Sequence, residues 1–115
     1  MDKLEKYQII IERTLTKISQ MLAQDPDIES LLCIDHQRKQ YILMSDGWFK
    51  GNRHYHPVVH IQMQANAEVW LRADNTDLEV GKDLIKQGID IKDMIAAFYS
   101  PNMRKYVRMQ IEQDS

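Results

Sequence analysis

The hydrophobic pattern of the chain changes its period at Pro26, from a helical repeat to an extended one. Before Pro26, apolar residues recur every three or four positions, at Leu4, Tyr7, Ile11, Leu15, Ile18 and Leu22. This spacing is typical of one face of an amphipathic helix. Because the residue before a proline disfavours helical backbone, the pattern predicts a helix over residues 2–24.

The fifty residues that follow favour β-strands. Residues 28–35, 40–45, 53–64 and 68–73 form strand-like runs with polar turns between them, and the third run shows the clearest alternation of apolar and polar residues. In the third run, one predicted face holds Tyr55, Pro57, Val59, Ile61 and Met63. The other predicted face holds His54, His56, Val58, His60, Gln62 and Gln64. Pro57 cannot donate to a strand ladder, so we expect it at a sheet edge or a bulge.

Helical signals return after the fourth run. Asn75 or Thr76 is suited to cap a helix that ends at Gly88, and residues 94–98 form an apolar run that we interpret as a further strand. Ser100 and Pro101 favour the start of a short helix reaching residue 106. We therefore predict one α+β domain over residues 1–115. It has a long N-terminal helix, an antiparallel meander sheet of about four or five strands, then short C-terminal helices.

The charge balance argues against a protein that binds duplex DNA over a broad surface. The chain has 15 Lys and Arg against 17 Asp and Glu, for a net charge of −2. Nucleic-acid binding depends on cations that neutralise phosphates, so such contact here needs a local patch. The most basic segment contains Arg104, Lys105 and Arg108 around Tyr106. It is either a nucleic-acid contact or a solvated helix end with Tyr106 against the core.

The compartment follows from features that the sequence lacks. It has no apolar stretch approaching the ~20 residues of a membrane span and no apolar core of a signal peptide at its start. The lone Cys33 lies in an apolar run, where we expect a buried, inert thiol. We therefore expect a cytoplasmic protein.

The histidines are the main candidates for chemistry. His54, His56 and His60 share the predicted strand face, but a rise of about 3.3 Å per residue separates them too widely for one metal ion. His54 and His56 with a cross-strand carboxylate such as Asp46 stay open as a metal site, and either histidine as an enzymatic group. The familiar nucleophile and phosphate-loop motifs are missing. We expect no catalytic, cofactor-binding or metal residues, and hence no enzyme.

A protein interface is the alternative that the strand pattern favours. Alternation places Trp70 with Arg72 on the face opposite Leu71, and large aromatic groups on a polar sheet face are typical of interfaces. The candidate partner-binding residues are His56, His60, Trp70 and Arg72. The other interpretation, that helices cover this face and Trp70 is core, is equally open.

Signals along nearly the whole chain, in the same order, resemble the XisI family. They are Met1-Asp2-Lys3-Leu4-Glu5-Lys6-Tyr7, Gly47-Trp48, Val59-His60-Ile61, Val69-Trp70-Leu71, Asn75-Thr76-Asp77, Gly88-Ile89, Asp93-Met94-Ile95, Phe98-Tyr99-Ser100-Pro101, Arg104 and Tyr106. The chain departs from the family at Ala65-Asn66-Ala67, where an Asp-Gly-Lys hairpin is usual, at Tyr99, where His is common, and at Asn75, where Gly is common.

The resemblance implies an accessory function. XisI proteins are small cyanobacterial factors known as fdxN-element excision controlling factors, and the family fold is α+β. It implies a role in programmed excision of a DNA element, with a XisH-like protein of nuclease-type fold as the partner that this chain binds and controls. We also consider a second copy of the chain as a partner. The resemblance supplies no catalytic residue.

Overall fold

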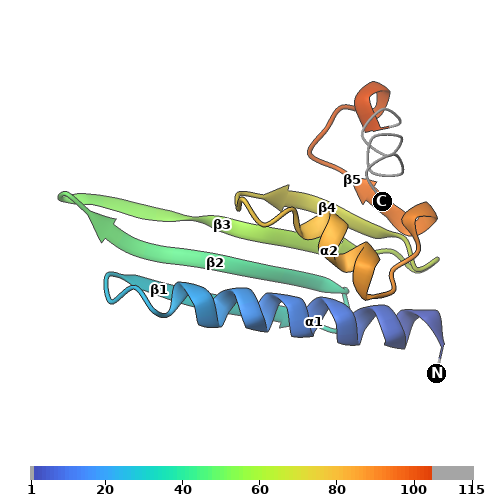
Figure 1. Ribbon diagram of the computed structural model, residues 1–115, viewed down its shortest axis with the longest axis horizontal. Coiled ribbons are helices and arrows are strands. Elements are labelled where there is room, and N and C mark those ends of the chain that lie inside the picture. The colour runs from blue at the N-terminus through green and yellow to red at the C-terminus, as the bar shows by residue number, and fades with distance from the viewer. Residues whose placement is uncertain (1, 105–115) are drawn as a thin grey trace.

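The computed structural model describes residues 2–104. Its elements, in chain order, are α1 (Lys3–Leu22), β1 (Ile28–Asp35), β2 (Gln40–Phe49), β3 (Asn52–Met63), β4 (Val69–Asp74), α2 (Val80–Gln87), the 3₁₀ turn η1 (Ile91–Asp93) and β5 (Met94–Ala96). One sheet contains all five strands in the order β1-β2-β3-β4-β5. The predicted α+β class is confirmed, with the elements arranged as Figure 1 shows.

Helix α1 forms where its apolar stripe predicts it. Asp2 caps its start, since a carboxylate oxygen accepts a hydrogen bond from the Glu5 amide at 2.8 Å. The stripe then packs on the sheet and buries Tyr7, Ile11 and Leu15 almost completely. The helix ends at Leu22, two residues before the predicted limit, and the loop to β1 contains Pro26.

The sheet is an antiparallel meander of four strands, with a fifth strand added in parallel at the β4 edge. Strands β1 to β4 pair in antiparallel fashion as expected, but β5 runs parallel to β4, pairing Val69 with Met94 and Leu71 with Ala96. The prediction of a purely antiparallel sheet was wrong at this edge. A parallel neighbour requires a crossover connection, which α2 and η1 provide. Strand β2 also continues four residues beyond the predicted end at Ser45, to Phe49.

Both helices lie on one side of the sheet. One hydrophobic cluster joins α1 and α2 with inward residues of all the central strands, among them Leu43, Ile61 and Leu71. In Figure 1 α1 and α2 lie in front of the strands, with α1 over β1. The burial of β2 alternates strictly from Gln40 to Gly47, which shows that only one of its faces is fully covered within the described residues.

Two bulges change which side chains share a face. Leu43 pairs with Val59 but Met44 pairs with Pro57, so Val58 is an extra residue in β3. Beyond it, the side-chain alternation of β3 is shifted by one residue. Directly paired antiparallel residues share a face, and Ser45, which pairs with His56, is buried on the helix side.

The predicted faces of β3 are therefore wrong before the bulge. His54 and His56 lie on the helix side of the sheet, whereas His60, which pairs with Ile42, lies on the other side. Tyr55 and Pro57 are exposed and do not join Val59 on the core face. The expectation for Pro57 holds, because it adjoins the bulge and β4 does not extend alongside it.

Helix α2 begins later than predicted. Its N-cap is Glu79, so neither Asn75 nor Thr76 caps it. Asp74 organises the approach by accepting hydrogen bonds from the Thr76 amide at 3.0 Å and the Val80 amide at 3.2 Å, and the Thr76 hydroxyl accepts from the Leu78 amide at 3.1 Å. Gly88 ends the helix with φ 126°, a left-handed conformation that favours glycine. After β5, residues 101–104 form a helical turn, and the rest of the predicted C-terminal helix lies outside the described residues.

Candidate partner-binding surface

The side of the sheet away from α1 and α2, here called the open face, is the main candidate site. Strand register places on it side chains that pair directly across neighbouring strands: Leu31 with Met44, Cys33 with Ile42, Ile42 with His60, Asp46 with Tyr55, Gln62 with Trp70, and Trp70 with Ile95. Neither α1 nor α2 covers this face, and the helical turn at residues 101–104 meets it only at Trp70, through the Arg104 side chain. Apolar and aromatic groups therefore form its centre.

The open face is only partly shielded from solvent. Leu31, Ile42, Met44 and Trp70 are half-buried, and Cys33 is exposed. The prediction of a buried Cys33 was wrong, because β1 turns that residue to the side without helices. An exposed apolar surface of this kind is typical of an interaction site.

A two-stranded arm extends the open face beyond the rest of the sheet. The arm comprises residues 48–57 of β2 and β3, all of them exposed, and passes the ends of β1 and β4 (Figure 1). Trp48 is 61% exposed and Tyr55 55% exposed, and the Arg53 guanidinium lies 4.6 Å from the Tyr55 ring centroid. The same guanidinium contacts both carboxylate oxygens of Asp46 at 3.1 Å. The arm therefore presents aromatic rings, the Lys50 ammonium over the Phe49 ring and the Arg53 charge, which Asp46 compensates.

Trp70 lies at the centre of a polar cluster on the opposite half of the open face. Its Nε1 donates to Glu68 at 3.3 Å. The guanidinium carbons of Arg72 and Arg104 lie 5.2 and 5.6 Å from the indole centroid. These are cation–π distances. The structure thus brings the predicted residues Trp70 and Arg72 together and adds Arg104, which comes from the far end of the described chain.

His60 completes this cluster. Its Nε2 lies 2.8 Å from Gln40 Oε1, and Arg72 Nε donates to Gln62 at 2.8 Å on the same face. Burial lowers the pKa of His60, and the nearby positive charge of Arg72 lowers it further. Burial and the Arg72 guanidinium therefore both favour the neutral form of the His60 imidazole. Sequence alternation correctly associated His60, Trp70 and Arg72.

His56 does not belong to this surface. The bulge at Val58 places it on the helix side of the sheet, exposed beyond the end of the core. His54 is on that side too, 6.1 Å from the Phe49 ring, whereas Asp46 pairs with Tyr55 on the open face. The His54, His56 and Asp46 combination is thus divided between two faces. Within residues 2–104 no three metal-binding side chains gather.

The C-terminal basic patch is only partly described. Arg104 donates from Nε to the Tyr99 carbonyl at 3.0 Å and from an Nη to the Ala97 carbonyl at 3.1 Å. Its guanidinium is therefore fixed beside Trp70 by the fold. Lys105 and Arg108 lie outside the described residues, so the nucleic-acid patch stays a prediction.

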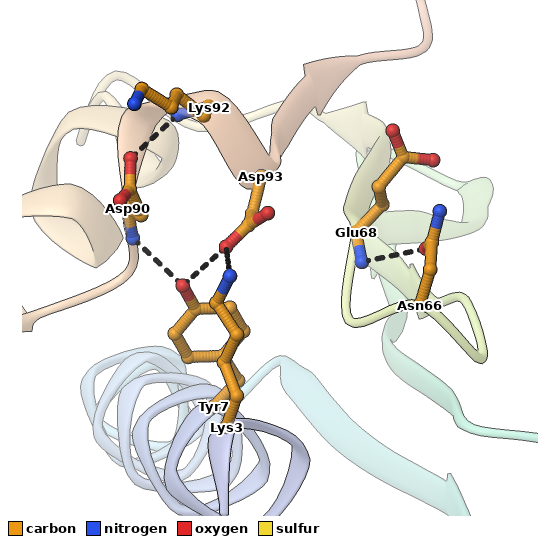
Figure 2. Close-up of polar contacts among 7 residues, drawn as sticks. All are labelled: Lys3, Tyr7, Asn66, Glu68, Asp90, Lys92 and Asp93. Carbon is orange, nitrogen blue, oxygen red and sulfur yellow. Dashed lines mark hydrogen bonds and ion pairs between the residues drawn. The ribbon is translucent and has the colours of Figure 1, made fainter.

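A second polar cluster joins α1 to η1 and was missed by the sequence analysis (Figure 2). The Tyr7 hydroxyl donates to Asp93 Oδ2 at 2.6 Å and accepts from the Asp90 amide at 3.0 Å, while Lys3 Nζ lies 2.8 Å from the same Asp93 oxygen. Tyr7 is only 2% exposed. The apolar stripe indicated Tyr7 as core but gave no sign of this pairing.

The charges of this cluster are matched. Burial alone would raise the pKa of Asp93, but hydrogen bonds from Lys3 and Tyr7 outweigh burial and lower it. Burial and the hydrogen bond to Asp93 raise the pKa of Tyr7, which keeps its hydroxyl protonated. A buried hydroxyl that donates to a charge-paired carboxylate is typical of a structural contact between two elements. Here the contact links α1 to η1 and so positions the segment that leads into β5.

The fold and the open face together define a small α+β protein whose sheet carries helices on one side and an uncovered aromatic surface on the other, within the described residues. No helix among residues 2–104 is long and apolar enough to span a membrane. The chain belongs to the XisI family, since the family model for the XisI protein matches residues 1–111. No curated protein matches the chain.

Two solved structures from Anabaena variabilis ATCC 29413 are similar along most of their length. A XisI-like protein is 30% identical with a TM-score of 0.81, and the match covers 90% of this chain and 94% of that one. The fdxN element excision controlling factor XisI is 32% identical with a TM-score of 0.76, covering 90% of this chain and 99% of that one. The predicted family is thereby confirmed.

Proposed function

We propose that this protein is a non-enzymatic accessory factor that controls excision of a DNA element by binding a protein partner that resembles XisH. Membership of the XisI family and similarity to an excision controlling factor support the general role. The contact surface in this proposal is the open face, with Trp70, His60 and Arg72 on one half and the arm on the other. The observation that carries the proposal is that this face holds aromatic and apolar side chains that neither α1 nor α2 covers.

The composition of the open face fits a protein interface. Interfaces are enriched in Trp, Tyr, Met and Arg, and a few large anchors supply most of the binding energy. Trp70 is such an anchor, because it is half-buried, rigidly flanked and central on its half of the sheet. Trp48 and Tyr55 on the arm add exposed aromatic area. The same face also suits a second copy of the chain as the occupant.

Co-purification with a XisH-like protein, followed by affinity measurement on the Trp70→Ala variant, tests this function. Loss of an anchor costs about 2 kcal/mol or more, so we expect affinity to fall at least about thirtyfold. Ile9→Ala is the matched control, because Ile9 is 46% exposed on α1. Light scattering separates the complex from self-association. Equal affinities of wild type and Trp70→Ala remove the open face as the contact surface.

A further inference from the structure

We propose that Arg72 and Arg104, held against Trp70, form a binding point for an acidic side chain of the protein partner. The proposal rests on the proposed function, since it assigns the partner's chemistry at the same surface. A carboxylate of the partner meets the free edge of the Arg72 guanidinium, and Arg104 supplies a second fixed positive charge.

Arg72 lies at a bulge of β4. His60 pairs with Ala73 but Ile61 pairs with Leu71, so Arg72 is the extra residue of β4 and lacks a direct partner in β3. Bulges commonly redirect a side chain and recur beside functional sites. Trp70 is two residues earlier on the same face, and the Arg72 guanidinium, without a direct partner residue in β3, lies over its ring.

The guanidinium of Arg72 is held in a way that leaves its outer edge available. Its Nε donates to Gln62 Oε1 at 2.8 Å, and its Cζ is 5.2 Å from the Trp70 ring centroid. Neither Nη has a hydrogen bond or ion pair with any residue from 2 to 104. Two Nη groups on one guanidinium match the two oxygens of a carboxylate. Because Arg72 is already oriented, binding loses little side-chain entropy.

Arg104 adds a second immobilised cation at the same indole. Its hydrogen bonds to the carbonyls of Ala97 and Tyr99 fix it 5.6 Å from the Trp70 centroid. Among the described carboxylates, none lies within ion-pair distance of Arg72 or Arg104. Arg53 and Arg38 differ, since each is paired with an aspartate at 3.1 Å. Two cations without a described carboxylate partner, held on a half-buried aromatic ring, attract an anion.

The surrounding charges favour a single carboxylate over a nucleic-acid strand. Glu68 contacts the edge of Trp70, and Asp46 and Glu29, which pair with each other, lie on the same open face. A chain of phosphates crossing this face would approach these acids, whereas one acidic side chain would meet only the two guanidinium groups. The net charge of −2 opposes a polyanion further.

The test measures affinity for the XisH-like protein with variants at Arg72. Arg72→Gln removes the charge, and we expect binding to weaken at least about tenfold, as for loss of a charged hydrogen bond. Arg72→Lys keeps the positive charge but loses the two Nη groups that can bind both oxygens of a carboxylate, so it should restore binding only in part. Arg38→Gln removes the same charge from the turn after β1, where Asp35 already pairs with it, and should change affinity less than about twofold. Thermal unfolding of each variant checks the fold.

Each outcome decides between the claims. If the wild type binds and Arg72→Gln matches it, or weakens binding no more than Arg38→Gln, the acidic contact is refuted while the proposed function stands. If duplex or single-stranded oligonucleotides bind and Arg72→Gln abolishes that binding, the anion is phosphate and the proposal is also refuted.

A second measurement applies if the XisH-like protein does not bind at all, which refutes the proposed function. In the Trp48→Phe variant, Trp70 is the remaining tryptophan. We expect a glutamate-containing peptide to change its fluorescence saturably and the glutamine version to leave it unchanged. Equal responses to both peptides refute the carboxylate site.

Discussion

The tie between α1 and η1 gives the sharpest test of how this fold is held together. The Tyr7 side chain is 2% exposed, and its hydroxyl donates to Asp93 at 2.6 Å and accepts from the Asp90 amide at 3.0 Å. Tyr7→Phe removes both hydrogen bonds while keeping the aromatic ring in place. The variant therefore measures the polar tie separately from the packing.

The expected cost follows from the two bonds. A hydrogen bond to a charged group contributes about 1.5–3 kcal/mol, and a neutral one about 0.5–1.5 kcal/mol. Lys3 still neutralises Asp93 in the variant, at 2.8 Å, so the carboxylate is not left alone. We expect the free energy of unfolding to fall by about 2–3 kcal/mol.

Urea denaturation followed by circular dichroism measures this difference. Because the pKa of Asp93 is lowered in the folded protein, its contribution is present above its unfolded value near 4 and is lost as the pH falls through the folded pKa. The gap between wild type and Tyr7→Phe should therefore shrink below about pH 4. A difference under about 0.5 kcal/mol at neutral pH would refute the reasoning.

Three further predictions concern single side chains. Gly47→Ala should destabilise the protein by about 1–3 kcal/mol in urea denaturation, because a Cβ there would lie 2.7 Å from the Asp27 carbonyl oxygen; an unchanged midpoint would contradict this. The Tyr41 hydroxyl is buried without a hydrogen-bond partner in residues 2–104, so Tyr41→Phe should leave stability unchanged or raise it by about 1 kcal/mol. Burial raises the pKa of Tyr41 to about 12, so stability should decline from about pH 10, where the unfolded tyrosine ionises, towards pH 12, and less so in Tyr41→Phe. Cys33 should react with a maleimide in the folded state at nearly the unfolded rate, and strong protection would contradict its exposed position.

Periodicity predicted the elements well but not the faces of β3. A strand that alternates with period two carries no obvious mark of an extra residue, and the predicted faces assumed none. The adjacent apolar pair Val58 and Val59, both buried, was the available signal, with Pro57 beside it. Two adjacent apolar residues are compatible with a bulge, and a bulge at this point separates His56 from His60.

The direction of β5 was not predicted for a different reason. Parallel and antiparallel strands have the same side-chain period, so the run that begins at Met94 gave no direction by itself. The helix between β4 and that run was the informative feature, because a strand, a helix and a neighbouring strand form a crossover that makes the two strands parallel.

The sequence predicted that Trp70 and Arg72 lie together in the candidate site, but not that Arg104 joins them. Trp70 and Arg72 are two positions apart, so strand alternation placed them together, and the open face contains both. The approach of Arg104 depends on how the chain turns after β5, through hydrogen bonds to the backbone carbonyls of Ala97 and Tyr99. Tertiary contacts of this kind have no local sequence pattern, as is also true of Tyr7 with Asp93.

Fluorine NMR on the Trp48→Phe variant, labelled with 5-fluorotryptophan, tests most directly whether the partner covers Trp70. The label then reports on a single indole. On addition of unlabelled XisH-like protein, we expect the resonance to shift and broaden in proportion to complex formed. If the two proteins co-elute while the resonance stays unchanged, the partner binds elsewhere and the assignment of the open face is wrong.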